Sequence, residues 1–244
     1  MSNPFGHAET DTEMSAFERD FQAWRKSRAE ALQDGFGELS CYRSANVALR
    51  AAAPDEGRVV FFGDSITEGW RLDEYFPGEP YLNRGISSQT TSQMLLRFRQ
   101  DVAALAPSIV LIHAGTNDIG GNCGPVLLED IEANCASMAD IAHANGIRVI
   151  FSSLLPPPHE ETPLSRFNLL KHPPERTSAL NRWLREYSAA NGCDFLDYGS
   201  AMCGAGGHIR PELSEDGLHP TPAGYRVMTP LAQAAIRCAL APEA

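Results

Sequence analysis

After residue 57 the chain alternates between short apolar runs and stretches in which apolar residues recur at helical spacing. The helical spacing lies near residues 90–104, 126–145, 175–191 and 222–240. The short runs, most of them nearly continuous in Val, Ile, Leu and Phe, lie at 58–63, 81–84, 108–115, 148–153 and 193–197. Buried strands that alternate with helices are typical of a parallel sheet covered on both faces. The pattern therefore predicts a doubly wound α/β domain with a five-stranded parallel sheet.

The segment before this domain has only a helical pattern. Its large apolar side chains follow one another at helical steps, at Phe17, Phe21 and Trp24. Glycines at 35 and 37 indicate where this helical segment ends. We expect residues 1–57 to form a helical extension packed on the core, with the aromatic stripe in that contact, and residues 58–244 to form the core domain.

A proline-rich stretch predicts one long loop. Residues 153–174 contain six prolines, so they cannot be regular structure throughout. Long loops inside compact domains usually carry function. Because this loop follows the fourth predicted strand, we expect it at the edge of the sheet where ligands bind. His159 and His172 lie within it and are candidates for contact with a substrate.

Charge narrows the classes of partner. The 244 residues include 31 Asp and Glu against 20 Lys and Arg, a formal charge of −11. Nucleic acids and anionic membranes are bound mainly through Lys and Arg, so we expect neither as a partner. The N-terminus shows no basic and apolar leader, and the apolar runs are far shorter than the ~20 residues of a membrane-spanning helix. These features predict a cytoplasmic protein, whose oligomeric state the sequence does not indicate.

The cysteines suggest neither a metal site nor a disulfide framework. Six are scattered along the chain, and no two form a CxxC pair. We expect reduced thiols that are mostly buried as small apolar side chains.

Four polar clusters follow predicted strands or precede the last helix. They are Gly63–Thr67, Asn83–Ile86, Gly115–Asp118 and Asp216–Pro220. Because the carboxyl ends of parallel strands meet at one edge of a sheet, we expect the first three clusters to lie close together there. Any one cluster is weak evidence for a site, whereas four in this order at one edge are much less probable by chance.

Each cluster has an ordinary structural interpretation beside a chemical one. Ser65 sits where a helix N-terminus favours developing negative charge, although serine is also a common helix cap. Gly85 could bring a backbone N–H close to a ligand or simply form a turn. Asn117 could donate its amide N–H to an oxyanion or form an Asx turn. Asp216 and His219 are three residues apart, so one turn can place the carboxylate beside the imidazole and leave Nε2 free as a base.

Taken together, the blocks GDSIT, NRGI, GTND and DGLHP resemble the signature of the SGNH hydrolases, also called the GDSL esterase/lipase family. The resemblance covers roughly residues 58–240 and departs from the family name only at Ile66, where that name has leucine. It implies a flavodoxin-like fold for this part of the chain. It does not account for the N-terminal helices, which are a candidate extra layer or rim of the site.

The resemblance also implies roles for single residues. Ser65 would be the nucleophile, with His219 as its base and Asp216 as the residue that orients the imidazole. The oxyanion hole would be formed by Gly85 and Asn117 together with the backbone N–H of Ser65. No cofactor or metal is needed for this chemistry.

The implied reaction is the hydrolysis of carboxylic esters through an acyl-serine intermediate. The polar and glycine-rich blocks and a mean hydropathy of −0.24 favour small acyl groups, with an acetylated sugar as the first candidate substrate. The family's platelet-activating-factor acetylhydrolase-like members carry similar GTND and DGLHP blocks and point the same way. Acyl thioesters and lysophospholipids remain alternatives within the family.

Two other classes of function stay open. Asp64, Asp216 and His219 could hold a divalent metal in a phosphoester hydrolase, although Ser65 and Asn117 would then go unused. A binding module without catalysis is disfavoured because every member of the implied triad is present. The G-x-S-x-G elbow of α/β-hydrolases and the glycine-rich nucleotide motifs do not occur.

Three further polar residues near the blocks have structural interpretations. We expect Asp64 and Asp118 to accept hydrogen bonds from backbone groups and so to hold the turns in which they lie. We expect His113 to be a hydrogen-bonded histidine of the core.

Overall fold

The computed structural model describes residues 35–52, 57–158 and 173–241, together with some residues between 19 and 33. By its contacts the chain divides into two units, Met1–Phe36 and Gly37–Ala244. In the first unit the described residues between 19 and 33 are helical. The stripe of Phe17, Phe21 and Trp24 lies outside the described residues. The domain boundary at residue 57 stays a prediction.

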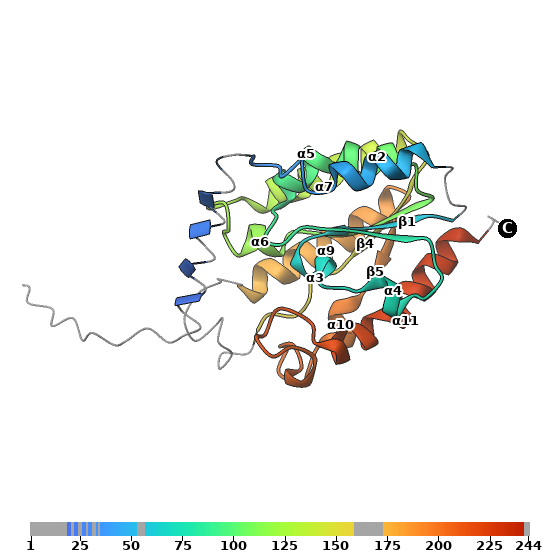
Figure 1. Cartoon of the computed structure of the whole chain (residues 1–244). Helices are drawn as coiled ribbons and strands as arrows, with labels where there is room; N and C mark the ends of the chain where they lie inside the picture. Colours follow the sequence, from blue (N-terminus) through green and yellow to red (C-terminus); the bar gives the residue numbers. More distant parts are fainter. Residues whose placement is uncertain are drawn as a thin grey trace, which may run out of the picture. The chain divides into compact units, whose positions relative to one another are not determined.

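The second unit is built on a parallel sheet, which confirms the predicted fold class (Figure 1). The strands lie side by side in the order β2-β1-β3-β4-β5. Every neighbouring pair is parallel. Their bounds are β1 (Val59–Gly63), β2 (Tyr81–Gly85), β3 (Ile109–His113), β4 (Arg148–Ser152) and β5 (Asp194–Leu196). Each coincides with one of the apolar runs seen in the sequence.

Helices cover both faces of this sheet because the strands are apolar on both sides. Val60 and Phe62 pack on one face, and Val59 and Phe61 on the other. The first face is covered by α5 (Thr91–Asp101), α7 (Leu128–His143) and α9 (Pro174–Ala190). The second is covered by α4 (Leu72–Tyr75), α10 (Tyr198–Met202) and α11 (Pro222–Leu240). Figure 1 shows α5 and α7 on the side opposite α4, α10 and α11.

Shorter elements complete the unit. Helix α2 (Arg43–Ala51) lies beside α5 on the first face (Figure 1). The turns that follow β1 and β3 are the short helices α3 (Ser65–Glu68) and α6 (Thr116–Ile119). Two 3₁₀ turns are η1 (Ala103–Leu105) and η2 (Pro211–Leu213).

The register of the strands sets the edge at which the polar clusters meet. Gly63 at the end of β1 is paired with Gly85 of β2 on one side and with His113 of β3 on the other. The residues that follow these three therefore leave the sheet at the same level. This brings the first three polar clusters to one edge, as the sequence predicts.

Two other expectations from the sequence meet the structure here. Residues 153–158 have no regular structure, and 159–172, with His159 and His172, lie outside the described residues. All six cysteines are free thiols, but the expectation that most are buried is wrong, because only Cys135 is. Within the described parts of the chain, no helix combines the length and apolar character needed to cross a membrane.

Candidate active site

The turn that carries Ser65 is fixed by its neighbour Asp64. The Asp64 carboxylate caps α3 by accepting a hydrogen bond from the backbone N–H of Ile66 at 3.0 Å. Ser65 is the first residue of that helix, two residues beyond the end of β1. The carbonyl of Ile66 also accepts a 2.8 Å hydrogen bond from the hydroxyl of Tyr225 on α11. The serine is thus held from two sides, by its own cap and by a distant helix.

The structure brings Ser65, His219 and Asp216 into one hydrogen-bonded row. Ser65 Oγ lies 2.9 Å from His219 Nε2, across 154 residues of sequence. His219 Nδ1 lies 2.6 Å from Asp216 Oδ2. The other carboxylate oxygen, Oδ1, accepts the backbone N–H groups of Leu218 and His219, both at 2.8 Å. This geometry suits an imidazole that carries its proton on Nδ1 and offers Nε2 to the serine.

The contact between Asp216 and His219 shifts the pKa of both side chains. Burial alone would raise the pKa of Asp216, but the hydrogen bond and charge of His219 lower it to about 2. Burial alone would lower the pKa of His219, and the hydrogen bond and charge of Asp216 overcome this and raise it above its ordinary value. The side chains stay 45% and 29% exposed for His219 and Asp216, so the pair is accessible from solvent. The carboxylate thus stays ionised beside the imidazole over the ordinary pH range.

Asn117 lies nearby on α6, with its amide held by three partners. Its Nδ2 donates to the carbonyl of Gln89 at 3.0 Å and lies 3.3 Å from Asp64 Oδ2. Its Oδ1 accepts a 2.7 Å hydrogen bond from Nδ2 of Asn122. The side chain is 6% exposed. Through Asp64, the amide is tied to the turn that carries Ser65.

Gly85 is placed at the same edge, but its N–H is turned to its own loop. It donates to Asn83 Oδ1 at 2.8 Å. A Cβ at Gly85 would lie 2.1 Å from the backbone nitrogen of Glu68, so glycine is required for β2 to approach α3. A role for this N–H in an oxyanion hole would require it to exchange Asn83 for the oxyanion. The observed role of Gly85 is close packing.

Sequence reasoning missed several residues that support this edge. Asn83 donates through Nδ2 to the carbonyls of Thr67 and Trp70, at 2.6 and 2.9 Å, and so ties β2 to the end of α3. Asn83 belongs to the NRGI block, which was a usable signal. Tyr42, whose hydroxyl donates to the carbonyl of Gly85, belongs to no block, and nothing in its sequence context marks it.

The three residues expected to have structural roles have them. His113 is buried, with Nδ1 2.8 Å from the hydroxyl of Ser152. Asp64 accepts the Ile66 N–H, as predicted, and its burial raises its pKa against the opposing charge of His113. Asp118 accepts from the N–H and hydroxyl of Thr91, at 2.9 and 2.6 Å, and so joins α6 to the start of α5.

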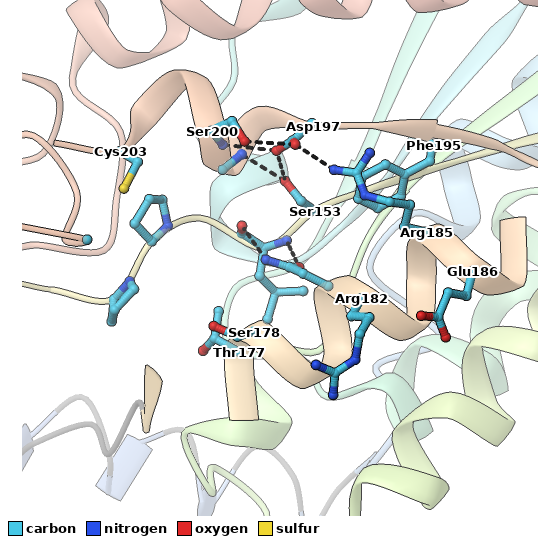
Figure 2. Close-up of a pocket in the computed structure, with 16 residues that line it drawn as sticks. Ser153, Thr177, Ser178, Arg182, Arg185, Glu186, Phe195, Asp197, Ser200 and Cys203 are labelled. Atoms are coloured by element: carbon cyan, nitrogen blue, oxygen red, sulfur yellow. Dashed lines mark hydrogen bonds and ion pairs between the residues drawn. The ribbon is translucent and has the colours of Figure 1, made fainter. Parts of the chain in front are cut away.

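A cavity of about 450 Å³ lies beyond the ends of β4 and β5, between α9 and α10 (Figure 2). Figure 2 shows Ser153, Arg185 and Ser200 converging on Asp197 at its wall. Its charged lining residues are two bases and two acids: Arg182, Arg185, Glu186 and Asp197.

A narrow crevice, with room for about 10 Å³, lies between this cavity and the site. It is lined by Ile66, Thr116 and Leu218, the chain neighbours of Ser65, Asn117 and His219. It shares four lining residues with the cavity, namely Leu154, Pro156, Pro157 and Thr177. The two hollows therefore abut along the strand ends.

The alternative interpretation, a divalent metal site, is not supported by the described residues. Nowhere in them do three or more His, Cys, Asp or Glu side chains gather in a way that could hold a metal ion. Asp64, which that interpretation needs, is instead engaged with the Ile66 N–H and the Asn117 amide.

Comparison with known proteins gives a consistent result. The family model of the GDSL-like Lipase/Acylhydrolase family matches residues 61–227. A GDSL-like lipase from Bacteroides thetaiotaomicron VPI-5482 is 41% identical, with a TM-score of 0.77, over 84% of this chain and 100% of that one. A protein of Bacteroides fragilis NCTC 9343 described as an acylhydrolase is 38% identical, with a TM-score of 0.77, over 84% of this chain and 98% of that one.

A more distant structure shares the fold. A variant of an acetylxylan esterase from Geobacillus stearothermophilus is 20% identical, with a TM-score of 0.60, over 75% of this chain and 95% of that one. Among curated proteins the search gives no match.

Proposed function

Since the chain belongs to the GDSL-like lipase/acylhydrolase family, as its four sequence blocks predict, we propose that it hydrolyses carboxylic esters through nucleophilic attack by Ser65. The observation that carries the proposal is the row of hydrogen bonds from Ser65 Oγ through His219 to Asp216, at 2.9 and 2.6 Å. A serine, a base within hydrogen-bond reach and a carboxylate that orients the base form the arrangement needed for nucleophilic catalysis.

In the first half-reaction His219 acts as general base and then as general acid. Nε2 takes the hydroxyl proton as Ser65 Oγ attacks the ester carbonyl. The tetrahedral intermediate collapses when the same proton is given to the leaving alcohol, and an acyl-serine remains. Asp216 stays ionised and stabilises the imidazolium, which agrees with its pKa of about 2.

The oxyanion is held by the Ser65 N–H and the Asn117 amide. Both Nδ2 hydrogens of Asn117 are engaged, one with the Gln89 carbonyl and one with Asp64 Oδ2. Asn117 takes this role if the longer contact, 3.3 Å to Asp64, gives way to the oxyanion while Gln89 and Asn122 keep the amide in place. Gly85 joins them if its N–H leaves Asn83. Water then repeats the attack on the acyl-serine, with His219 again as base, and releases the acid. Each step uses only groups of the chain, substrate and water.

We propose a small acyl group, with an acetylated sugar as the first candidate substrate. The crevice next to the Ser65 turn is mainly apolar and has room for about one water-sized group, so it leaves no space for a long acyl chain. The larger cavity has a mainly apolar lining with several hydrogen-bonding side chains, and its two acids balance its two bases, so it favours an uncharged alcohol over an ionic one. Its volume of about 450 Å³ falls in the range of small-molecule sites.

The test is hydrolysis of p-nitrophenyl esters from acetyl to palmitoyl by wild type, Ser65→Ala and Ser137→Ala. Ser137 is a half-buried serine of α7 whose hydroxyl donates to the carbonyl of Ala133, and it serves as a serine control away from the site. We expect the highest kcat/KM on the acetyl and butyryl esters, loss of turnover in Ser65→Ala and wild-type rates in Ser137→Ala. A serine-directed phosphonate should inactivate the enzyme, and a chelator should not.

Each outcome separates one part of the proposal. Wild-type rates in Ser65→Ala contradict the serine mechanism. A rate that peaks at long acyl chains contradicts the small acyl group and favours a lysophospholipase. If p-nitrophenyl acetate is a good substrate but fully acetylated xylose is not, the sugar assignment fails while the esterase assignment stands.

A further inference from the structure

One guanidinium lies buried at the carboxyl edge of the sheet and takes no part in the mechanism above. Arg97 of α5 is 0% exposed. Its guanidinium lies over the ring of Phe62, 4.2 Å from the ring centroid. An arginine cannot shed its charge by deprotonation, so burial is tolerated only if its N–H groups are satisfied. The acceptors that satisfy it show what the residue does.

Arg97 donates to three segments that surround the site. Its Nη2 donates to the carbonyl of Gly63 at 3.0 Å, and its Nη1 to the carbonyl of Arg84 at 2.9 Å. Its Nε donates to the side chain of Gln89. The charge is balanced by Asp101, whose Oδ2 lies 3.1 Å from Nη1.

Each acceptor lies next to a group of the site. Gly63 ends β1 two residues before Ser65, and Arg84 directly precedes Gly85. The backbone carbonyl of Gln89 accepts the hydrogen bond from the Asn117 amide, at 3.0 Å. A single planar side chain thus joins the ends of β1 and β2 to the loop on which the Asn117 amide rests.

We propose that Arg97 is a positioning residue for the oxyanion side of the site. The inference rests on the proposed function. Arg97 fixes the separation of the β1 and β2 ends and the place of the Gln89 loop, so the Ser65 turn and the Asn117 amide remain aligned. The role requires the fork geometry of a guanidinium, because the single ammonium of lysine cannot reach three acceptors in these directions.

The fold supplies a matched control at the opposite edge of the same sheet. Arg58 directly precedes β1, is 2% exposed and donates to the carbonyl of Leu105 at 2.8 Å. Arg58 and Arg97 are therefore buried arginines near opposite ends of one strand, and it is Arg97 that lies at the end that carries the site. A lysine at either position keeps the charge and loses the fork.

The experiment compares Arg97→Lys with Arg58→Lys on p-nitrophenyl acetate, with active enzyme counted by phosphonate titration. We expect Arg97→Lys to lower kcat about 10–100-fold at nearly unchanged KM, the size of effect that follows a misplaced catalytic group. Phosphonate inactivation should slow in parallel, while the pH at which activity rises should stay where it is. Arg58→Lys should keep kcat within about twofold of wild type, whatever its loss of thermal stability.

Gln89→Met keeps the proposal testable if Arg97→Lys does not fold. It removes one acceptor of Arg97 and retains the Arg97–Asp101 pair, and we expect a several-fold loss of kcat at unchanged KM. Two results would overturn the positioning role. One is wild-type kcat in Arg97→Lys, or in Gln89→Met where Arg97→Lys does not fold. The other is an equal loss of kcat in Arg97→Lys and Arg58→Lys. The proposed function fails separately, through retained activity of Ser65→Ala in the same assay.

Discussion

The two sides of the site are built in opposite ways. The side that activates the nucleophile is a single exposed turn, in which Asp216 accepts hydrogen bonds from Leu218 and His219 within three residues of itself. The side that would hold the oxyanion is buried, and Asn117 depends on groups from distant parts of the chain. Its contacts are Asp64 and Gln89, which lie 53 and 28 residues away, and Asn122.

This difference predicts how substitutions will behave. A turn that makes its own hydrogen bonds can lose a functional group with little effect on folding, because solvent replaces what is lost. A buried network cannot, since each remaining polar group loses a partner in a place that water does not reach. Damage to the exposed side should therefore appear mainly in kcat. Damage to the buried side should appear in kcat and in stability.

Among the substitutions that compare the two sides, the largest effect is expected from Asp216→Asn. We expect kcat to fall by about 10³–10⁴-fold, because asparagine no longer fixes the imidazole with its proton on Nδ1. The base must be neutral to act, so activity falls as the pH drops through the pKa of His219. Asp216 raises that pKa, so in Asp216→Asn the rise of kcat/KM should move to lower pH.

The measurement is a pH profile of kcat/KM together with thermal unfolding, with Asp73→Asn on α4 as the control. The melting temperature of Asp216→Asn should stay within a few degrees of wild type near pH 7. A profile whose rising limb keeps its position, or moves to higher pH, would contradict the coupling of Asp216 to His219.

Asn117→Ala should cost less activity and more stability. Loss of one oxyanion donor typically lowers kcat by about 10²–10³-fold. Alanine also leaves the buried Gln89 carbonyl without the Asn117 amide, which costs about 1–3 kcal/mol of the free energy of unfolding for a buried group left unsatisfied, and it removes one partner of the half-buried Asn122. Chemical denaturation and steady-state kinetics measure the two effects. Asn145→Ala, at the exposed end of α7, is the control; unchanged stability in Asn117→Ala would show that the network is not what holds this side.

The contrast between the two sides also explains what the sequence could predict. The strands were predictable because their apolar residues form continuous runs, and the turn at Asp216 because the groups that donate to its carboxylate all lie between residues 214 and 219. The residues that hold the oxyanion side could not be found in this way. Arg97 resembles any arginine on an amphipathic helix until β1 and β2 are placed beside it, and Tyr42 belongs to no motif.

Gly85 and the cysteines show the same limit. The sequence places Gly85 at the right edge, but the partner of its N–H is decided by the side chain of Asn83 across the turn. The cysteines were expected to be buried as small apolar side chains, but only Cys135 lies on a helix face that packs on the sheet. Cys238 lies on an exposed part of α11, and the other four lie in turns and loops. The sequence pattern predicts the helices and strands and the edge of the sheet at which the strands end. It does not predict which side chains contact one another between distant segments.

The smallest effect tests whether support from outside the motifs reaches the oxyanion side. Tyr42→Phe removes the hydroxyl that donates to the carbonyl of Gly85 and leaves the ring in place under the guanidinium of Arg84. We expect kcat to fall by about two- to fivefold at unchanged KM, because one hydrogen bond worth about 0.5–1.5 kcal/mol is lost from the β2 end.

The control is Tyr75→Phe, which removes a 3.3 Å hydrogen bond from the tyrosine hydroxyl to the carbonyl of Pro222, at the start of α11 near the exposed turn. Equal kcat in the two variants would mean that the hydroxyl of Tyr42 does not act on the site. A loss confined to Tyr42→Phe would place the segment before α2 among the supports of the oxyanion side, although no motif marks it. The hydrogen bonds that support the buried side would then extend further from the reacting atoms than those of the exposed side. This would explain why the buried side is sensitive to distant substitutions.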